Sequence, residues 1–470
     1  MNVESERANG HWGERIGALC GALALGLSTF GVTIDFGTVV GDVKPVNGVG
    51  QPPIIWYDGT SLFHYMKEAG IPYSRLHDVG GPYGSNIFVD IPNLFRNFDA
   101  DEDDPANYDF TFTDLLLAKL VENGVEPYFR LGVTIENAAR RKAYRVFPPK
   151  DYAKWARIAE HVIRHYTEGW ADGFRYRITH WEIWNEPDST ERVETNAMWR
   201  APFPTFIEFY DVVSRHLKSK FPHLKIGGYG SSGFWLIAGA PPEKITPGRR
   251  NYVTCFTNFL AAAEARRFPL DFFSFHSYAS PAATVKQMAW CRQKLDEYGL
   301  VDTEMSLNEW LPDPAHEDLG TAKQAASIAA ELVALQHGPV VDAEIYDARC
   351  GVGAYSPLFN CLTFKPHKAY YVFLAFNELR KLGRAVKVTG SADQTGAETG
   401  LWATAAVGAD GSGAALFANT GAAQPIDLGA FGRRTLDCRI IDETRQYELI
   451  VPPTEIGSNT VLLVRYAKAP

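Results

Sequence analysis

A glutamate near the middle of the chain has the surroundings that cleavage of a glycosidic bond requires. Residues 180–188 read His-Trp-Glu-Ile-Trp-Asn-Glu-Pro-Asp. The aromatic and β-branched run that opens this segment is typical of a strand, and Pro187, which lacks a backbone donor, ends it directly after Glu186. We therefore expect a carboxyl group at a strand tip, beside the amide of Asn185 and between indole rings. Such a carboxyl can protonate a leaving oxygen, while an amide binds a sugar hydroxyl and aromatic faces contact sugar rings.

A second glutamate occupies the same kind of position further along the chain. Residues 305–312 read Met-Ser-Leu-Asn-Glu-Trp-Leu-Pro, which places Glu309 at another predicted strand end. In a parallel barrel, two strand ends on opposite sides project into one cleft. One carboxyl can then act as acid/base and the other as nucleophile at the anomeric carbon of a sugar, at a separation of about 5 to 5.5 Å.

The two glutamates are expected to differ in protonation. We expect Glu186 to be held neutral by the charge of Glu309 and by apolar walls such as the indoles of Trp181 and Trp184. Glu309 is expected to stay ionised beside an arginine and a tyrosine hydroxyl from neighbouring strand ends.

Other predicted strand ends supply those neighbours. Arg75 and His77 are two residues apart and share a strand face, as do His276 and Tyr278. For each of these four residues, a structural role is as plausible as a catalytic one. Further candidate site residues at the ends of other strands are Trp310, Asp347 and Arg130. For Asp347 and Arg130 a structural role is favoured over a catalytic one.

The elements that would position these residues alternate between strand and helix patterns. The predicted strands span residues 46–49, 73–79, 125–132, 180–184, 224–229, 271–278, 305–310 and 342–346. The predicted helices span residues 112–122, 152–166, 204–218, 282–298 and 321–337. Eight strands interleaved with helices predict an α/β fold, a (β/α)8 TIM barrel rather than a doubly wound sheet.

The sequence pattern changes after a closing helix at residues 367–382. Short alternating segments separated by Gly and Asp turns predict a C-terminal antiparallel β-sandwich domain, with strands at 385–388, 401–406, 413–419, 434–441, 447–451 and 460–466. An early strand at residues 32–40 is expected to join it. We thus predict a barrel over 41–383, an accessory sandwich from 30–40 plus 384–470, and an N-terminal extension over 1–29, either a signal segment or a disordered one.

Composition excludes several classes of function. The net charge of −9 argues against nucleic acid and against an anionic membrane surface. The six cysteines form no Cys-x-x-Cys pair and are expected to be mostly buried free thiols. No zinc spacing, phosphate-binding glycine motif or serine-hydrolase elbow occurs, so we expect neither metal nor cofactor. The apolar run 16–34 follows a segment without net positive charge, which favours a cytoplasmic protein over a periplasmic or secreted one.

Taken together, these motifs resemble those of the clan A retaining glycosidases, and within them glycoside hydrolase family 39, the family of β-xylosidases and α-L-iduronidases. Further similar stretches are Val-Lys-Pro-Val-Asn-Gly-Val-Gly (43–50), Tyr-Ser-Arg-Leu-His-Asp (73–78) and Lys-Pro-His-Lys-Ala-Tyr-Tyr (365–371). The resemblance covers residues 30–470. It implies Glu186 as acid/base, Glu309 as nucleophile, and Asn185 as the contact to the 2-hydroxyl of the sugar in subsite −1.

The substrate stays open because the loops at 79–104 and 190–206 depart from the β-xylosidase pattern. A β-xylosidase acting on xylo- or related plant oligosaccharides is the leading interpretation. An arabinosidase, a uronidase and an exopolysaccharide endo-hydrolase are the alternatives; a uronidase would need strand-end cations, of which the sequence offers Arg75, Arg130 and Arg349. A silent carbohydrate-binding protein is the alternative from another class, disfavoured because it needs no pair of aimed carboxyls. The oligomeric state is open.

Overall fold

The structure is a computed structural model that describes residues 31–53, 60–77, 88–134, 146–234, 237, 243, 245–351, 353–429 and 431–468. The expectations for the extension over residues 1–29 lie outside the described residues, as does the part of the 79–104 loop up to residue 87.

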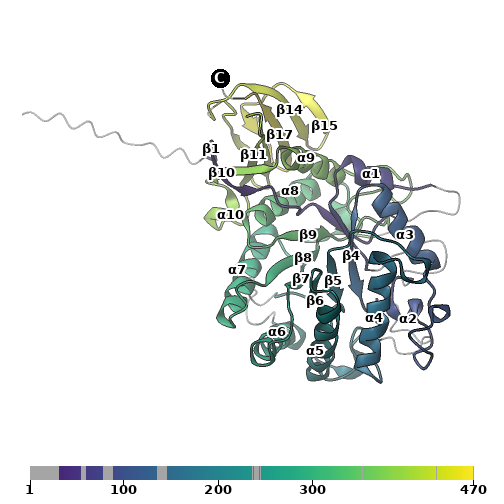
Figure 1. Ribbon diagram of the computed structural model, residues 1–470. Helices are drawn as coiled ribbons and strands as arrows, with labels where there is room; N and C mark the ends of the chain where they lie inside the picture. The colour runs from purple at the N-terminus through teal and green to yellow at the C-terminus, as the bar shows by residue number, and fades with distance from the viewer. Residues whose placement is uncertain are drawn as a thin grey trace, which may run out of the picture. The chain divides into compact units, whose positions relative to one another are not determined.

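In the described part of the chain, eight parallel strands close into a barrel in chain order (Figure 1). The strands are β2 (Gly48–Gly50), β3 (Tyr73–Arg75), β4 (Glu126–Leu131), β5 (His180–Ile183), β6 (Lys225–Ser231), β7 (Phe272–Ser277), β8 (Glu304–Trp310) and β9 (Asp342–Ile345). Nearly every residue of these strands is buried, because one side faces the barrel interior and the other faces helices. The predicted barrel is confirmed, and each observed strand overlaps a predicted one.

Helices surround the barrel (Figure 1). Within the described ranges they are α1 (Phe63–Glu68), α2 (Ile91–Leu94), α3 (Thr111–Glu122), α4 (Tyr152–Thr167), α5 (Phe203–Lys220), α6 (Pro247–Arg266), α7 (Pro281–Glu297), α8 (Ala322–His337), α9 (Lys368–Leu382) and α10 (Ala392–Thr395). Short 3-10 turns lie at Pro105–Asn107, Trp170–Asp172, Val193–Thr195 and His316–Asp318. The helix α6 is not among the predicted helices named above, although its buried stripe of Phe256, Phe259, Leu260 and Ala263 has helical spacing.

A seven-stranded antiparallel sheet follows the barrel. Its strands, in spatial order, are β1 (Thr33–Asp42), β10 (Arg384–Thr389), β11 (Leu401–Val407), β12 (Gly413–Asn419), β17 (Thr460–Tyr466), β14 (Thr435–Ile441) and β15 (Gln446–Ile450). A two-stranded sheet of β13 (Gln424–Pro425) and β16 (Glu455–Ile456) accompanies it. The early strand β1 pairs with β10, as expected from the sequence. The antiparallel β domain after the barrel is confirmed, whereas the exact domain boundaries stay a prediction.

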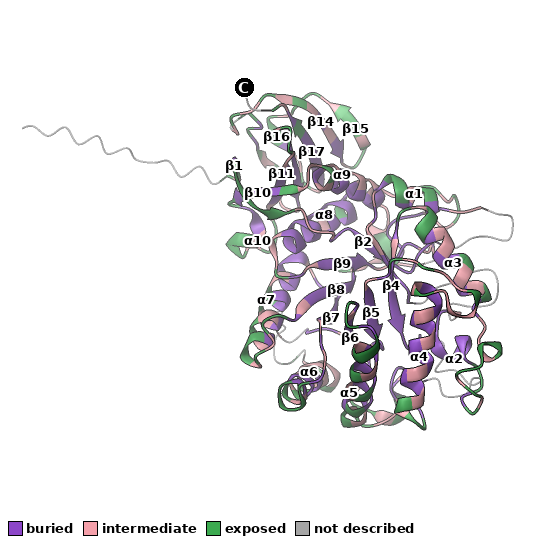
Figure 2. Cartoon of the chain, viewed as in Figure 1, coloured by how far each residue is buried: buried purple, intermediate pink, exposed green. Residues whose placement is uncertain are grey.

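The large sheet is joined to the barrel through two helices. The helices α8 and α9 both contact β11 and β12, and side chains such as Trp402 and Leu416 belong to the same apolar cluster as the barrel core. The other sheet face carries Phe417 and Leu462, which form a separate small core. Figure 2 shows α8 as largely buried, which fits its alanine-rich sequence.

Two further sequence expectations concern thiols and membranes. The described cysteines are all free, and Cys255, Cys291, Cys350 and Cys438 are buried while Cys361 is partly exposed, which confirms the expectation for these five. In the described ranges, none of the helices is long and apolar enough to cross a membrane.

Candidate active site

The carboxyl groups of Glu186 and Glu309 meet at the C-terminal end of the barrel. Glu186 follows β5, and Glu309 lies near the end of β8, where it is paired in register with His276 of β7. The His276 Nδ1 atom is 2.8 Å from Glu186 Oε1 and 3.6 Å from Glu309 Oε1. One oxygen of each glutamate lies within 4.8 Å of the other. This spacing matches the short separation of about 5 to 5.5 Å at which one carboxyl can reach the anomeric carbon while the other reaches the leaving oxygen.

The backbone around Glu186 turns sharply to aim its side chain. Glu186 has φ 44° and Trp184 has φ 78°, both in the left-handed region. For residues other than glycine this region costs roughly 1–2 kcal/mol each, so the surrounding contacts must hold the turn. The Glu186 N–H donates to the Gly230 carbonyl at the end of β6 (2.9 Å), and the Asn196 amide donates to the Pro187 carbonyl (2.9 Å).

Glu309 is surrounded by groups that stabilise its charged form. The Tyr278 hydroxyl donates to Oε1 at 2.5 Å, and Arg75 Nη1 donates to Oε2 at 3.0 Å. Burial and the Glu309 charge raise the pKa of Tyr278 well above its usual value, so this hydroxyl stays a donor. Glu309 itself is 7% exposed. The expected arginine and tyrosine partners of Glu309 are therefore in place.

A buried carboxylate that the sequence analysis did not select holds Arg75 in position. Glu182 accepts from Arg75 Nε at 2.7 Å through Oε2, and through Oε1 it accepts from Ser274 (2.6 Å) and Asn308 (2.7 Å). Burial opposes the charge of Arg75, but Glu182 and Glu309 together raise its pKa above the usual value. The sequence does contain a signal for Glu182, because it is a charged residue inside an otherwise apolar strand, four positions before Glu186.

The same guanidinium orients Asn185. Arg75 Nη2 donates to Asn185 Oδ1 at 2.6 Å, so the amide nitrogen of Asn185 is turned the other way, 3.5 Å from His77 Nε2. Burial, reinforced by the charges of Arg130 and Arg75, lowers the pKa of His77 well below its usual value. A neutral imidazole can accept from Asn185, which leaves the amide a second N–H for a hydroxyl.

The surroundings of Glu186 disfavour its charged form. Burial raises the pKa of Glu186 to about 7, against the opposing effects of the Arg75 charge and a hydrogen bond from Ser232. Burial also lowers the pKa of His276, so its neutral ring can accept the proton of Glu186 at Nδ1. A carboxylic acid that is still protonated near neutral pH, next to a carboxylate, is the combination required for acid and nucleophile.

The expectation that indole rings line the cleft beside Glu186 is wrong. Trp181 is fully buried and stacks on Phe129 at 4.9 Å. Trp184 donates its indole N–H to the Met198 carbonyl (2.9 Å) and packs near Trp155 in the layer between strand and helices. Alternate side chains of β5 point out of the barrel, and the backbone turns at Trp184. Both rings therefore point away from the barrel mouth.

Aromatic surface near Glu309 comes instead from three tyrosines. The rings of Tyr346 and Tyr355 lie 6.0 and 5.4 Å from that of Tyr278. Tyr355 is 47% exposed, whereas Trp310, an expected substrate contact, is fully buried. The exposed ring lies in the long segment after β9, where the sequence offers no periodic signal.

The other predicted site residues with charged side chains form ion pairs. Asp347 accepts from Arg349 Nε (3.0 Å) and from Ser356 Oγ (3.1 Å). Arg130 Nη2 donates to the buried Asp90 at 2.6 Å. These contacts give Asp347 and Arg130 evident structural roles.

Ligand atoms of Glu186, His276 and Glu309 also converge closely enough to hold a metal ion. Both oxygens of Glu309 already accept hydrogen bonds from Tyr278 and Arg75, and the guanidinium places a positive charge 3.0 Å away. The donor set therefore fits proton transfer better than cation binding.

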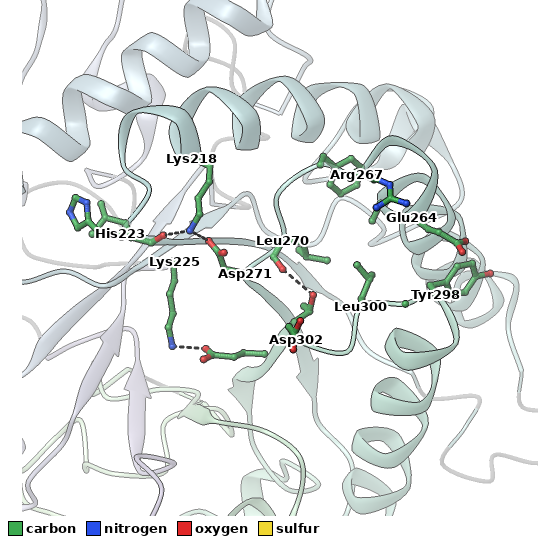
Figure 3. A pocket seen from close by; sticks show the side chains of 16 residues that line it. Lys218, His223, Lys225, Glu264, Arg267, Leu270, Asp271, Tyr298, Leu300 and Asp302 are labelled. Carbon is green, nitrogen blue, oxygen red and sulfur yellow. Dashed lines mark hydrogen bonds and ion pairs between the residues drawn. The ribbon is translucent and has the colours of Figure 1, made fainter.

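A cavity of about 670 Å³ lies at the opposite, N-terminal end of the barrel (Figure 3). Four of its charged side chains form two ion pairs: Lys218 with Asp271 (2.6 Å) and Lys225 with Glu304 (2.5 Å). Ion pairs at the N-terminal end of a barrel usually stabilise the fold, because the active sites of such barrels lie at the C-terminal ends of the strands.

Comparisons with known proteins show which proteins the chain is similar to. The family model of glycosyl hydrolases family 39 matches residues 59–309, a span that contains both glutamates. A β-xylosidase of Geobacillus stearothermophilus is 27% identical over 225 residues, which is 45% of this chain and 39% of that enzyme. The chain thus matches well under half the length of that curated relative.

Solved structures share the fold. A glucosidase from Croceicoccus marinus has a TM-score of 0.70 at 20% identity, covering 93% of this chain and 99% of that one. A monomeric β-xylosidase from Caulobacter crescentus CB15 has a TM-score of 0.65 at 16% identity, with the same coverage. A family 51 α-L-arabinofuranosidase from Bifidobacterium longum has a TM-score of 0.61 at 15% identity, again covering 93% and 99%.

Proposed function

The chain belongs to glycosyl hydrolases family 39, and we propose that it cleaves glycosidic bonds with retention of configuration, as a β-xylosidase acting on xylo- or related plant oligosaccharides. The observation that carries this proposal is the approach of Glu186 and Glu309 to within 4.8 Å across His276. A gap this short favours direct attack by one carboxylate over attack by a water held between the two.

In the first step, Glu309 attacks the anomeric carbon while Glu186 protonates the departing oxygen. Tyr278 and Arg75 hold the Glu309 carboxylate in one orientation and stabilise its charge. Glu186 can supply the proton near neutral pH because burial raises its pKa to about 7.

In the second step, Glu186 acts as base and draws a proton from water, which attacks the glycosyl-enzyme and frees Glu309. Loss of the Glu309 charge in the intermediate removes a neighbour that disfavours ionisation of Glu186, which suits its change of role. The hydrogen bond from Arg75 to Asn185 supports a role for the remaining Asn185 N–H as the donor to the 2-hydroxyl of the bound sugar.

Charge pairing favours a neutral sugar over a uronic acid. The three strand-end arginines each face a carboxylate: Arg75 faces Glu182 and Glu309, Arg130 faces Asp90, and Arg349 faces Asp347. Binding a uronate with any of them would require breaking a buried or half-buried ion pair. The relative from Geobacillus stearothermophilus is named a β-xylosidase, and this makes xylose the first sugar to test.

A silent carbohydrate-binding protein is the competing function from another class. It would have no use for a carboxyl with a raised pKa beside a carboxylate anchored by two donors. The geometry of Glu186 and Glu309 therefore favours an enzyme.

The test compares aryl β-xyloside, β-glucoside and α-L-arabinofuranoside with xylo-oligosaccharides, and follows the first product by NMR. We expect fastest turnover of the β-xyloside and β-xylose as the first product. Initial release of α-xylose would contradict the retaining mechanism. Binding of xylo-oligosaccharides without hydrolysis of any substrate would support the binding protein instead.

A further inference from the structure

Two exposed aromatic rings lie on loops at the C-terminal end of the barrel. Among the described residues, Phe147 and Tyr355 are the only Phe, Tyr or Trp side chains that expose nearly half of their surface, at 49% and 47%. Phe147 lies between β4 and α4, and Tyr355 lies between β9 and α9. Tyr355 packs against Tyr278 on the side of Glu309. The proposed mechanism has no use for Phe147, although loops at this end of a barrel carry the substrate contacts.

Hydrogen bonds join the loop after β4 to the loop that carries Glu186. The Arg200 backbone N–H donates to the Val146 carbonyl (2.8 Å), and Arg200 Nε donates to the Asn196 carbonyl (3.3 Å). The buried Asn196 side chain donates in turn to the carbonyl of Pro187, the residue after Glu186 (2.9 Å). Arg200 is therefore connected to the candidate acid/base through a short chain of hydrogen bonds.

The loop after β5 is held firmly along its length. Near its start, the fully buried Asp188 accepts from the Ser231 hydroxyl at 2.6 Å. Near its end, Asn196 Oδ1 accepts from the Trp199 N–H at 2.8 Å, and Trp199 is fully buried. Arg200, the next residue, is only partly buried. Its backbone is thus fixed while its side chain reaches the surface.

The Arg200 guanidinium lies over the ring of Phe147, 5.5 Å from the ring centre. In the part of the chain that the structure describes, Arg200 forms no ion pair, and its two Nη groups make no hydrogen bond. By contrast, the arginines at the strand ends each face a carboxylate: Arg75, Arg130 and Arg349. A guanidinium with available Nη groups can bind a carboxylate through two parallel hydrogen bonds.

The sequence that leads to Phe147 is basic, although the whole chain has a net charge of −9. Residues 135–145 lie outside the described ranges; their sequence contains a single acidic residue, Glu136, and four basic ones: Arg140, Arg141, Lys142 and Arg145. The exposed acidic residues of the described loop after β5, Glu191 and Glu194, form no ion pair with Arg200. This local excess of positive charge favours an anionic ligand.

We propose that Phe147 and Arg200 form a subsite for the leaving group, in which a sugar ring packs on Phe147 and the carboxylate of a uronic acid branch binds Arg200. The proposal rests on the function proposed above, in which Glu186 protonates the departing oxygen, so that the leaving group extends past the loop of Glu186. The preferred substrate is then an acidic xylo-oligosaccharide, from which a neutral terminal xylose is released. Such a preference fits the departure of residues 190–206 from the β-xylosidase pattern.

The test compares xylotriose substrates that differ only in one carboxylate. One carries a glucuronic acid branch on its second sugar, and its partner carries the carboxyl-reduced branch, which is glucose. A further pair carries the same branches on the third sugar. For release of terminal xylose by the wild type, we expect kcat/KM to be about three- to fivefold higher for the acidic member of at least one pair, as for a partly exposed ion pair. The preference should weaken in about 0.5 M NaCl, because salt screens such a pair.

Variants locate the preference. Arg200→Gln should abolish it, and Arg200→Lys, which keeps the charge but not the planar fork, should retain part of it. Arg192→Gln is the matched control, because it removes one positive charge from an exposed position of the same loop and should leave the preference unchanged. Phe147→Ala should raise KM for both members of a pair by similar factors, because contact between a sugar ring and an aromatic ring does not depend on the carboxylate.

Equal wild-type kcat/KM for the acidic and carboxyl-reduced members of both pairs would overturn the inference, as would an unchanged preference in Arg200→Gln. An equal loss of preference in Arg192→Gln would also overturn it, because the preference would then come from the general charge of the loop. Failure of the proposed function looks different, because the wild type would hydrolyse none of these sugars and no dinitrophenyl β-xyloside. The Kd values of the same sugars, measured by calorimetry, should then still favour the acidic member, and equal Kd values would refute the subsite.

Discussion

Replacement of Tyr278 by phenylalanine isolates one hydrogen bond to the candidate nucleophile. The lost bond is the 2.5 Å donation to Glu309 Oε1, and the ring keeps its packing against Tyr346 and Tyr355. A hydrogen bond to a charged group contributes about 1.5–3 kcal/mol. Because 1.36 kcal/mol corresponds to a factor of ten, the variant should lose about 10- to 150-fold in kcat/KM if the bond is fully used in the transition state.

The pH profile tells this loss apart from an effect on the acid/base. The lost hydrogen bond contacts Glu309 and not Glu186. The basic limb, which reports on Glu186, should stay in place.

The control is Tyr355→Phe, which changes a hydroxyl in the same tyrosine cluster without touching Glu309. It should retain the wild-type kcat/KM. Less than a threefold loss of kcat/KM in Tyr278→Phe would refute the assignment of Tyr278 as a support of the nucleophile.

Three further predictions concern neighbouring residues. Glu186→Ala should retain turnover of dinitrophenyl β-xyloside in the presence of azide and release β-xylosyl azide, whereas an α-azide product by NMR would refute double displacement. Glu186→Gln should unfold at a higher temperature than the wild type near pH 8, as measured by calorimetry. Because the pKa of Glu186 is about 7 in the folded protein and 4.5 in the unfolded chain, the wild type loses stability as the pH rises between these values. The loss can reach ~3 kcal/mol. Equal unfolding temperatures at pH 5 and pH 8 for both proteins would contradict the raised pKa. Tyr355→Ala should raise KM for xylo-oligosaccharides with little change in kcat, because its half-exposed ring can contact a sugar without touching the reacting carboxyls; an unchanged KM would remove it from the binding site.

The barrel and its strand ends were predictable because they depend on local patterns. A buried strand such as Phe272–Ser277 is a short apolar run, and its end is marked where polar residues such as His276 and Tyr278 begin. The position of Glu309 follows from the same reasoning. Pro187 cannot extend a strand, so the sequence alone locates the Glu186 carboxyl beyond a strand end, although β5 itself ends at Ile183.

The residues that the sequence analysis misplaced depend on non-local geometry. The rings of Trp181 and Trp184 were expected to line the cleft, but strand alternation and the positive φ at Trp184 direct them outward, and that backbone turn has no signature in the residue types. Asp188 could not be connected with Ser231 because the parallel pairing of β5 and β6 brings together two residues that are 43 positions apart in the sequence.

The most direct test of the account is to trap and locate the glycosyl-enzyme intermediate. A 2-deoxy-2-fluoro-β-xyloside with a dinitrophenyl leaving group slows both steps but slows hydrolysis of the intermediate more, so a covalent sugar should accumulate and be found by mass spectrometry of the digested protein. We predict one fluoroxylosyl group per chain, attached to Glu309 and absent in Glu309→Gln. A label on Glu186, or turnover of xylosides by a protein that never carries a label, would contradict the assignment of Glu309 as the nucleophile.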